Sequence, residues 1–361
     1  MCVRARAPPR LAPGAPSAPP PQLSPHSPRA RQAQEPNNNG QAPCNLAPSS
    51  QAAAFAALAR VAPQGTRLIG PDTGYLYPQT WLEAFLPLAN ASLHAVTHHV
   101  YNGASRRTYN SPQQLDSPLP EISWYTATVR RLAPGAQVWA GEDGPIGGGN
   151  DGTCGPNSIC GTYASSLWYA DDMALRAAHG FVQYQRQDLF GGAYGLLASR
   201  TGAMALGLAE PLLIRPDFWV NFLWKRCLGS DVLNASSSSA TVRAYAFSGA
   251  PASPYAHPAC ATSVQLLLIN LSNATSAAAA LPPVSGLPGF AAFALTPAGG
   301  QPFAALASLN GAPLPGAIDE AQADPASFLR GIVQAPRTGA VVDGLALAPL
   351  SITFVCYTAA A

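Results

Sequence analysis

Residues 121–149, EISWYTATVRRLAPGAQVWAGEDGPIGGG, contain in order a helix pattern, a turn, a short apolar strand and a polar strand end. Ile122, Tyr125 and Val129 fall on one face at helical spacing, and Pro134-Gly135 ends that helix. Residues 138–141 are short and apolar, which predicts a strand buried on both faces. Glu142 follows directly, so this helix–strand unit is expected to present an acid at the carboxyl end of its strand.

The same alternation continues on both sides of this stretch. The expected helices are 51–62, 81–88, 121–132, 166–179 and 217–228, and the expected strands are 67–70, 93–98, 138–141 and 181–184. Short buried strands that alternate with helices are typical of βα units on a parallel sheet. Four such units predict half of a (β/α)8 TIM-type barrel, and we expect the N-terminal half of the barrel to be absent from this chain.

The pattern changes at both ends of this segment. After residue 229 the period becomes two, and strands are expected at 242–247, 264–270, 291–295 and 351–357. Proline- and glycine-rich turns separate them, as in an antiparallel β-sandwich. Residues 1–50 contain twelve prolines and little apolar surface, which predicts disorder. The sequence thus predicts an α/β plus β chain: a disordered segment (1–50), a partial barrel (51–229) and a β-sandwich (230–361).

Composition excludes several classes of protein. Hydrophobic residues make up 48% of the 361 residues and charged residues 11%, and the net charge is +2. Such a chain has a core but no basic surface for nucleic acid. No apolar window is long enough for a transmembrane helix, and the first residues lack the apolar core of a signal peptide. No cofactor is expected.

The cysteines and the glycosylation sequons indicate in which cellular compartment the protein is expected. Cys154 and Cys160 bracket a short loop, so they form either a disulfide staple or two unrelated thiols. No histidine or second close pair completes a metal site, and no metal is expected. Four Asn-x-Ser/Thr sequons begin at Asn90, Asn234, Asn270 and Asn273. Together these features favour a glycoprotein that is secreted or delivered to a lysosome or vacuole.

Two of the expected strands end in polar residues. The second leads into His98, His99 and Tyr101, and the third leads into Glu142. In parallel βα barrels the working residues lie at the carboxyl ends of the strands. Glycoside hydrolysis requires one carboxylate that attacks the anomeric carbon and a second that protonates the leaving oxygen. Taken alone, however, Glu142 is better explained as a solvated loop acid, and the His-x-Tyr pair is also compatible with a polar cluster at a barrel rim.

An ordered set of short motifs resembles the heparanase-like enzymes of glycoside hydrolase family 79, in the form found in plants and algae. In chain order these motifs are GPDTG (70–74), VTHHVYNG (96–103), VWAGE (138–142), GGG (147–149), RQ (186–187), PDFW (216–219), LLINL (267–271) and LNG (309–311). Each is weak alone, but they are collinear from about residue 35 to the end of the chain. The resemblance implies a clan A barrel and a retaining mechanism.

The resemblance also assigns roles to single residues. Glu142 takes the place of the nucleophile, and Tyr101, two residues after His99, that of the tyrosine that hydrogen-bonds it. The acid/base is the glutamate of an Asn-Glu-Pro motif, and here Gln34-Glu35-Pro36 is the candidate, with Gln34 in place of the substrate-binding asparagine. Three residues match those that bind the carboxylate of the sugar: Gly148, Gly149 and Tyr194.

These observations favour a retaining β-glucuronidase or heparanase-like glycosidase. Its partner would be a glucuronate-containing polysaccharide, a proteoglycan or a small glucuronide, and peripheral membrane association is compatible with the sequence. The sequence leaves heparan sulfate, arabinogalactan and small glucuronides open, although the low charge disfavours heparan sulfate. The alternative is an inactive remnant that binds glycans. A glycosidase for neutral sugars is disfavoured by Gly148, Gly149 and Tyr194.

Overall fold

The structure is a computed structural model that describes residues 46–74, 79–146, 154–155, 157–190, 193–198, 212–251, 254, 256–261, 264–318 and 335–359. The chain divides into two compact units. The first comprises Met1–His99 and Thr128–Gln137, and the second comprises Val100–Ala127 and Val138–Ala361. Almost all of the segment expected to be disordered lies outside the described residues.

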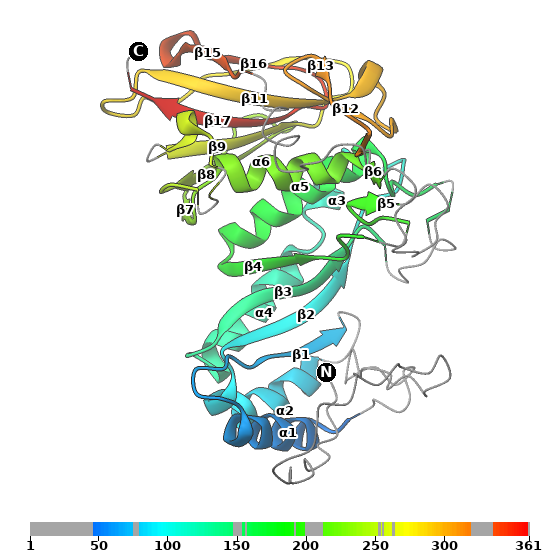
Figure 1. The fold of residues 1–361 in the computed structure, drawn as a ribbon, viewed down its shortest axis with the longest axis vertical. Helices are drawn as coiled ribbons and strands as arrows, with labels where there is room; N and C mark the ends of the chain where they lie inside the picture. Colours follow the sequence, from blue (N-terminus) through cyan, green and yellow to red (C-terminus); the bar gives the residue numbers. More distant parts are fainter. Residues whose placement is uncertain are drawn as a thin grey trace, which may run out of the picture. The chain divides into compact units, whose positions relative to one another are not determined.

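The first unit contains two helices and a pair of parallel strands. Helices α1 (Pro48–Val61) and α2 (Gln79–Ala89) lie side by side (Figure 1), and the rings of Phe55 and Phe85 meet edge to face at 5.6 Å. Strand β1 (Ile69–Gly74) pairs in parallel with β2 (Ala95–Tyr101), with the turn η1 (Asn90–Ser92) between α2 and β2. Gly70 allows β1 to approach α1, because a Cβ there would lie 2.5 Å from Phe55 Cζ.

The second unit continues the helix–strand alternation. Strands β3 (Gln137–Gly144) and β4 (Phe181–Arg186) pair in parallel, and α5 (Tyr163–Ala178) joins them. Helix α3 (Pro112–Leu115) and helix α4 (Leu119–Leu132) precede β3, and α6 (Pro216–Cys227) follows β4. The stripe predicted on α4 is buried, and Tyr125 stacks on Phe181 at 6.1 Å. These elements confirm the expected βα order.

All four of the parallel strands run further than predicted. The predicted ends were residues 70, 98, 141 and 184, whereas β1 ends at Gly74, β2 at Tyr101, β3 at Gly144 and β4 at Arg186. Glu142 was expected on a turn that follows the strand, and this was wrong, because it lies within β3. The polar residues at this strand end have hydrogen-bonding or charged partners inside the fold, so they do not have to leave the sheet.

The C-terminal part is antiparallel, as predicted. One eight-stranded sheet has the order β13-β12-β11-β17-β9-β8-β7, with β15 also paired to β11, and β10 and β16 form a separate pair. Its strands are β7 (Asp231–Leu233), β8 (Val242–Ser248), β9 (Val264–Asn270), β11 (Gly289–Pro297), β12 (Ala307–Leu309), β13 (Ala312–Pro313), β15 (Arg337–Ala340) and β17 (Ile352–Thr358). The smaller pair is β10 (Ala277–Ala279) and β16 (Leu345–Leu347), and short turns lie at η2 (Pro258–Cys260), η3 (Ala298–Gly300) and η4 (Val341–Asp343). That these sheets form a sandwich remains a prediction.

Alternate residues of the large sheet face two different cores. Leu267, Ile269 and Phe354 pack into a cluster with residues of α5 and α6, which lie side by side against the sheet (Figure 1). Leu268 and Val355 face a second cluster that includes residues of β16. The period-two pattern of the sequence therefore describes a sheet that is covered on both faces.

A third sheet was not predicted. Strand β14 (Ala317–Ile318) pairs with β6 (Leu212–Ile214), which pairs with β5 (Leu197–Ala198). The C-terminal part of the chain therefore adds one strand, β14, to a sheet whose other two strands, β5 and β6, precede α6. No helix among the described residues is long and apolar enough to cross a bilayer.

Candidate active site

The candidate nucleophile lies beside a tyrosine at the end of another strand. Tyr101 is the last residue of β2, and its hydroxyl donates a hydrogen bond to Oε1 of Glu142 near the end of β3. Both residues are half-buried. Burial raises the pKa of the Tyr101 phenol, and the Glu142 carboxylate raises it further. The phenol therefore stays protonated at neutral pH and remains a donor to Glu142.

Tyr194 and Gly144 complete this corner of the site. Tyr194 follows β4, is buried, and has its ring 6.3 Å from that of Tyr101. A Cβ at Gly144 would lie 2.6 Å from Cε1 of Tyr101 and 3.4 Å from Cε2 of Tyr194. Gly144 thus leaves the space in which both rings approach the end of β3.

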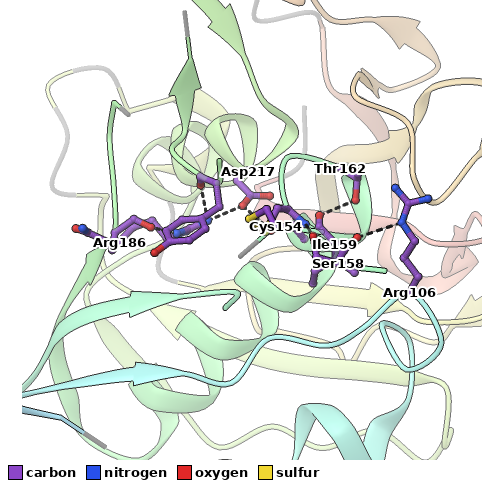
Figure 2. Close-up of a disulfide and its surroundings, with 11 residues drawn as sticks. Arg106, Cys154, Ser158, Ile159, Thr162, Arg186 and Asp217 are labelled. Atoms are coloured by element: carbon purple, nitrogen blue, oxygen red, sulfur yellow. Dashed lines mark hydrogen bonds and ion pairs between the residues drawn. A yellow bond between two sulfur atoms is a disulfide. The ribbon is translucent and has the colours of Figure 1, made fainter. Parts of the chain in front are cut away.

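A buried ion pair holds the backbone of Tyr194 in place. The Nη2 of Arg186 lies 3.0 Å from Oδ2 of Asp217 and donates to the carbonyl oxygen of Tyr194 at 2.9 Å (Figure 2). Asp217 also accepts hydrogen bonds from the hydroxyls of Ser165 and Ser166 at 2.8 and 2.9 Å. The Arg186 guanidinium lies 5.3–5.6 Å from the ring centroids of Trp168, Tyr169 and Tyr194. Burial by itself lowers the pKa of Arg186, but the Asp217 carboxylate outweighs this and raises it.

A second buried network holds the end of β3. Asp143 follows Glu142 and is fully buried, whereas Glu142 is half-buried. The Oδ2 of Asp143 lies 2.7 Å from Nε of Arg176, which also contacts Asp172 at 3.0 Å. The hydroxyl of Tyr184 donates to Asp172 at 2.9 Å. This network ties the end of β3, next to Glu142, to α5.

Glu121 on α4 interacts electrostatically with this network. Burial raises its pKa to about 7, the charge of Arg176 opposes the rise, and the charge of Asp172 adds to it. Glu121 therefore changes charge close to neutral pH. No role was predicted for it, because a single glutamate in the first turn of a helix carries no local signal that distinguishes it from a surface acid.

His99 belongs to the first compact unit. Its Nε2 lies 3.7 Å from Oδ1 of Asp72, and the Thr97 hydroxyl accepts from the Asp72 backbone N–H at 3.1 Å. Burial tends to raise the pKa of Asp72, but hydrogen bonds from His99 and Thr97 outweigh it and the pKa is lowered. Asp72 belongs to the GPDTG motif, which was the sequence signal for this residue, yet no role was predicted for it.

The structure brings together only part of the predicted site. Glu142, Tyr101 and Tyr194 lie close to one another in the second unit. The other predicted residues of the site, Glu35, Gln34, Gly148 and Gly149, lie outside the described residues.

Cys154 and Cys160 form a disulfide, which is the first of the two alternatives that their spacing left open, and a second disulfide joins Cys260 to Cys356. Among the described cysteines, Cys227 is free, and it is buried.

Known proteins resemble both the sequence and the fold. Residues 57–174, which include Tyr101 and Glu142, match the family described as glycosyl hydrolase family 79, N-terminal domain. Heparanase of Gallus gallus is 33% identical over 58% of this chain and 38% of its own length, and heparanase-like protein 1 of Arabidopsis thaliana is 32% identical over 57% and 35%. Baicalin-β-D-glucuronidase of Scutellaria baicalensis is 28% identical over 47% and 31%. The chain thus spans about a third of the length of these relatives.

The solved structures with a similar fold are those of glycosidases. The GH51 α-L-arabinofuranosidase of Thermotoga petrophila superposes with a TM-score of 0.59 at 9% identity, over 89% of this chain and 64% of that one. The chain shares the TIM-barrel-like fold of these structures. In sequence the chain is similar to the heparanase-like proteins of glycosyl hydrolase family 79.

Proposed function

We propose that this protein is a retaining glycoside hydrolase that cleaves glucuronate-containing glycans or glucuronides, with Glu142 as its nucleophile. The observation that carries the proposal is the hydrogen bond from the Tyr101 hydroxyl to Glu142 at the end of β3. A donor held in place by burial fixes the direction of the carboxylate that accepts from it. A retaining mechanism requires such an oriented carboxylate.

In the proposed reaction, a Glu142 oxygen attacks the anomeric carbon while the glycosidic C–O bond breaks. Glu35 donates its proton to the leaving oxygen, and Gln34 and His99 bind near the reacting sugar. In the second half, Glu35 takes a proton from water, the water oxygen attacks the anomeric carbon, and Glu142 leaves as a carboxylate.

The proposed substrate carries a glucuronate group. The support is the similarity to proteins named heparanase and baicalin-β-D-glucuronidase. The N–H groups of Gly148 and Gly149, together with Tyr194, are proposed to hold the carboxylate of the sugar. A polysaccharide, a proteoglycan or a small glucuronide would supply it.

We further propose a domain boundary near residue 229, with a β-sandwich beyond it, and delivery to the cell exterior, a lysosome or a vacuole. The two disulfides support this compartment, because disulfides persist in oxidising environments.

The test is a glucuronate-configured 2-fluoro label, which traps a covalent glycosyl ester on the nucleophile. Peptide mapping is expected to place the label on Glu142, and Glu142→Gln is expected to abolish labelling. Glu83→Gln is the matched control, because Glu83 lies on α2 in an ion pair with the exposed side chain of Arg131. Labelling of another residue, or labelling that survives Glu142→Gln, would show that the nucleophile is assigned wrongly. Binding of glucuronides without labelling would favour the alternative, an inactive glycan-binding protein.

A further inference from the structure

A pocket of about 340 Å³ opens beside Tyr101, on residues to which no role has been assigned so far. It is lined by Tyr101, residues 103–105, Pro145 and Ile146, and residues 155 and 157–160. Three segments therefore form its walls: the one after β2, the one after β3, and the loop closed by the Cys154–Cys160 disulfide (Figure 2).

The three walls are joined by close contacts. A Cβ at Gly103 would lie 2.5 Å from Cα of Pro145, so the segments after β2 and β3 touch there. Ser105 forms a β-bridge with Ser158, and the backbone N–H of Arg106 donates to the carbonyl oxygen of Asn157 at 3.0 Å. The disulfide closes the loop that carries Ser158. The pocket is therefore preformed, as ligand sites usually are.

The described lining residues carry no charged side chain. Apolar groups come from Ala104, Pro145, Ile146 and Ile159, and neutral polar groups come from Asn157 and Ser158. The remaining residues between Ile146 and Ile159 include neither lysine nor arginine. Burying a sulfate or carboxylate without a cationic partner is strongly unfavourable.

Arg106 follows the lining residue Ser105, but it has other partners. Its Nε donates to the carbonyl oxygen of Ser158 at 3.1 Å, as Figure 2 shows, and its guanidinium carbon lies 4.5 Å from the ring centroid of Phe303. The walls of the pocket thus offer hydrogen bonds and apolar contact rather than positive charge.

We propose that this pocket is a subsite for an uncharged sugar residue that neighbours the glucuronate in the substrate. The inference rests on the proposed function, because Tyr101 is shared: its hydroxyl donates to Glu142, and the residue also lines the pocket. The hydroxyls of a sugar would bond to Asn157 and Ser158, while its C–H face packs on Pro145 and Ile159. The described lining residues offer no positive charge to a sulfate group on that sugar.

The test measures binding, so it does not depend on turnover. Isothermal titration of the full chain would compare three thio-linked, non-hydrolysable ligands: methyl thioglucuronide, glucuronate linked to a neutral hexose, and the same disaccharide with a sulfate on the hexose. We expect the neutral disaccharide to bind at least about tenfold more tightly than methyl thioglucuronide, and the sulfate to cancel that gain.

Two variants test whether the tighter binding of the neutral disaccharide comes from this pocket. A side chain at Gly155 meets nothing within 4 Å, so Gly155→Phe fills the pocket without a backbone clash and is expected to remove the gain only. Gly135→Phe is the matched control, because a side chain there is equally free and Gly135 does not line the pocket. Asn157→Ala keeps the backbone bond to Arg106 and is expected to reduce the gain severalfold.

Each other outcome overturns a defined part of the reasoning. Equal affinity of methyl thioglucuronide and the neutral disaccharide would refute the subsite and leave the proposed function standing. Tighter binding of the sulfated ligand that is lost in Arg106→Gln would show an anion site instead. A larger gain from a phenyl thioglucuronide than from the hexose would mean an aryl occupant. If methyl thioglucuronide does not bind at all, the proposed function fails, and the subsite fails with it.

Discussion

Asp217→Asn removes the negative charge that faces Arg186 but keeps the size of the side chain. The two side chains are only 3% and 4% exposed and lie 3.0 Å apart. Removing one partner of a buried pair costs about 3–5 kcal/mol, because the remaining charge is buried without compensation. Arg186 keeps its bond to the Tyr194 carbonyl, and asparagine can still accept from one of the two serines. The lower limit, about 3 kcal/mol, is therefore expected.

Urea unfolding followed by tryptophan fluorescence measures this loss, since Trp168 lies beside Arg186. The exposed Asp343→Asn is the control and is expected to change the free energy of unfolding by less than about 0.5 kcal/mol. The double variant with Arg186→Gln is expected to lose less than the sum of the single variants, because it leaves no unpaired charge. A loss below about 1 kcal/mol for Asp217→Asn, or strict additivity, would refute the view that this pair supports Tyr194.

Three further changes test other parts of the structure. The raised pKa of Glu121 means that the folded state keeps a proton that the unfolded state releases, so the free energy of unfolding falls as the pH rises from about 4.5 to about 7. Glu121→Gln is expected to remove on the order of 2 kcal/mol of this dependence, and an unchanged pH profile of urea melts would contradict it. Replacing Cys260 and Cys356 by serine opens a link between residues 96 positions apart and is expected to cost about 4.7 kcal/mol, which an unchanged urea midpoint would exclude. Gly144→Ala pushes a methyl group against the Tyr101 ring and is expected to slow labelling of Glu142 about tenfold or more, while unaltered labelling would show that the ring position does not matter.

The sequence predicted the elements in which buried residues recur at a regular spacing along the chain. The stripe of Ile122, Tyr125 and Val129 on α4 and the alternation along β9 both follow from burial on one or two faces. What it could not predict depends on contacts between distant residues. Glu142 and Asp143 resemble a polar turn because their partners, Tyr101 and Arg176, are far away along the chain.

Short elements were missed for a different reason. Strands β5, β6 and β14 are two or three residues long, which is too short for any periodicity to emerge. The pairing of Cys260 with Cys356 likewise could not be derived from spacing, because it is set by where η2 meets β17. Within the candidate site, the tyrosine and the carboxylate were indicated by their places at strand ends. Arg186 and Asp217 lie in the RQ and PDFW motifs, but neither motif indicated that the two residues pair.

The β5-β6-β14 sheet has a consequence for the order in which the protein is completed during synthesis. Tyr194 lies just before β5, which pairs with β6, and β6 gains its other neighbour only from residues 317–318. The start of α5, immediately after the disulfide loop, is likewise bonded to late residues, since the N–H of Tyr163 donates to the carbonyl oxygen of Ala304. A nascent chain that already contains Glu142 and Tyr194 therefore still lacks the strand that closes this edge. The site can reach its final form only after most of the C-terminal part has left the ribosome.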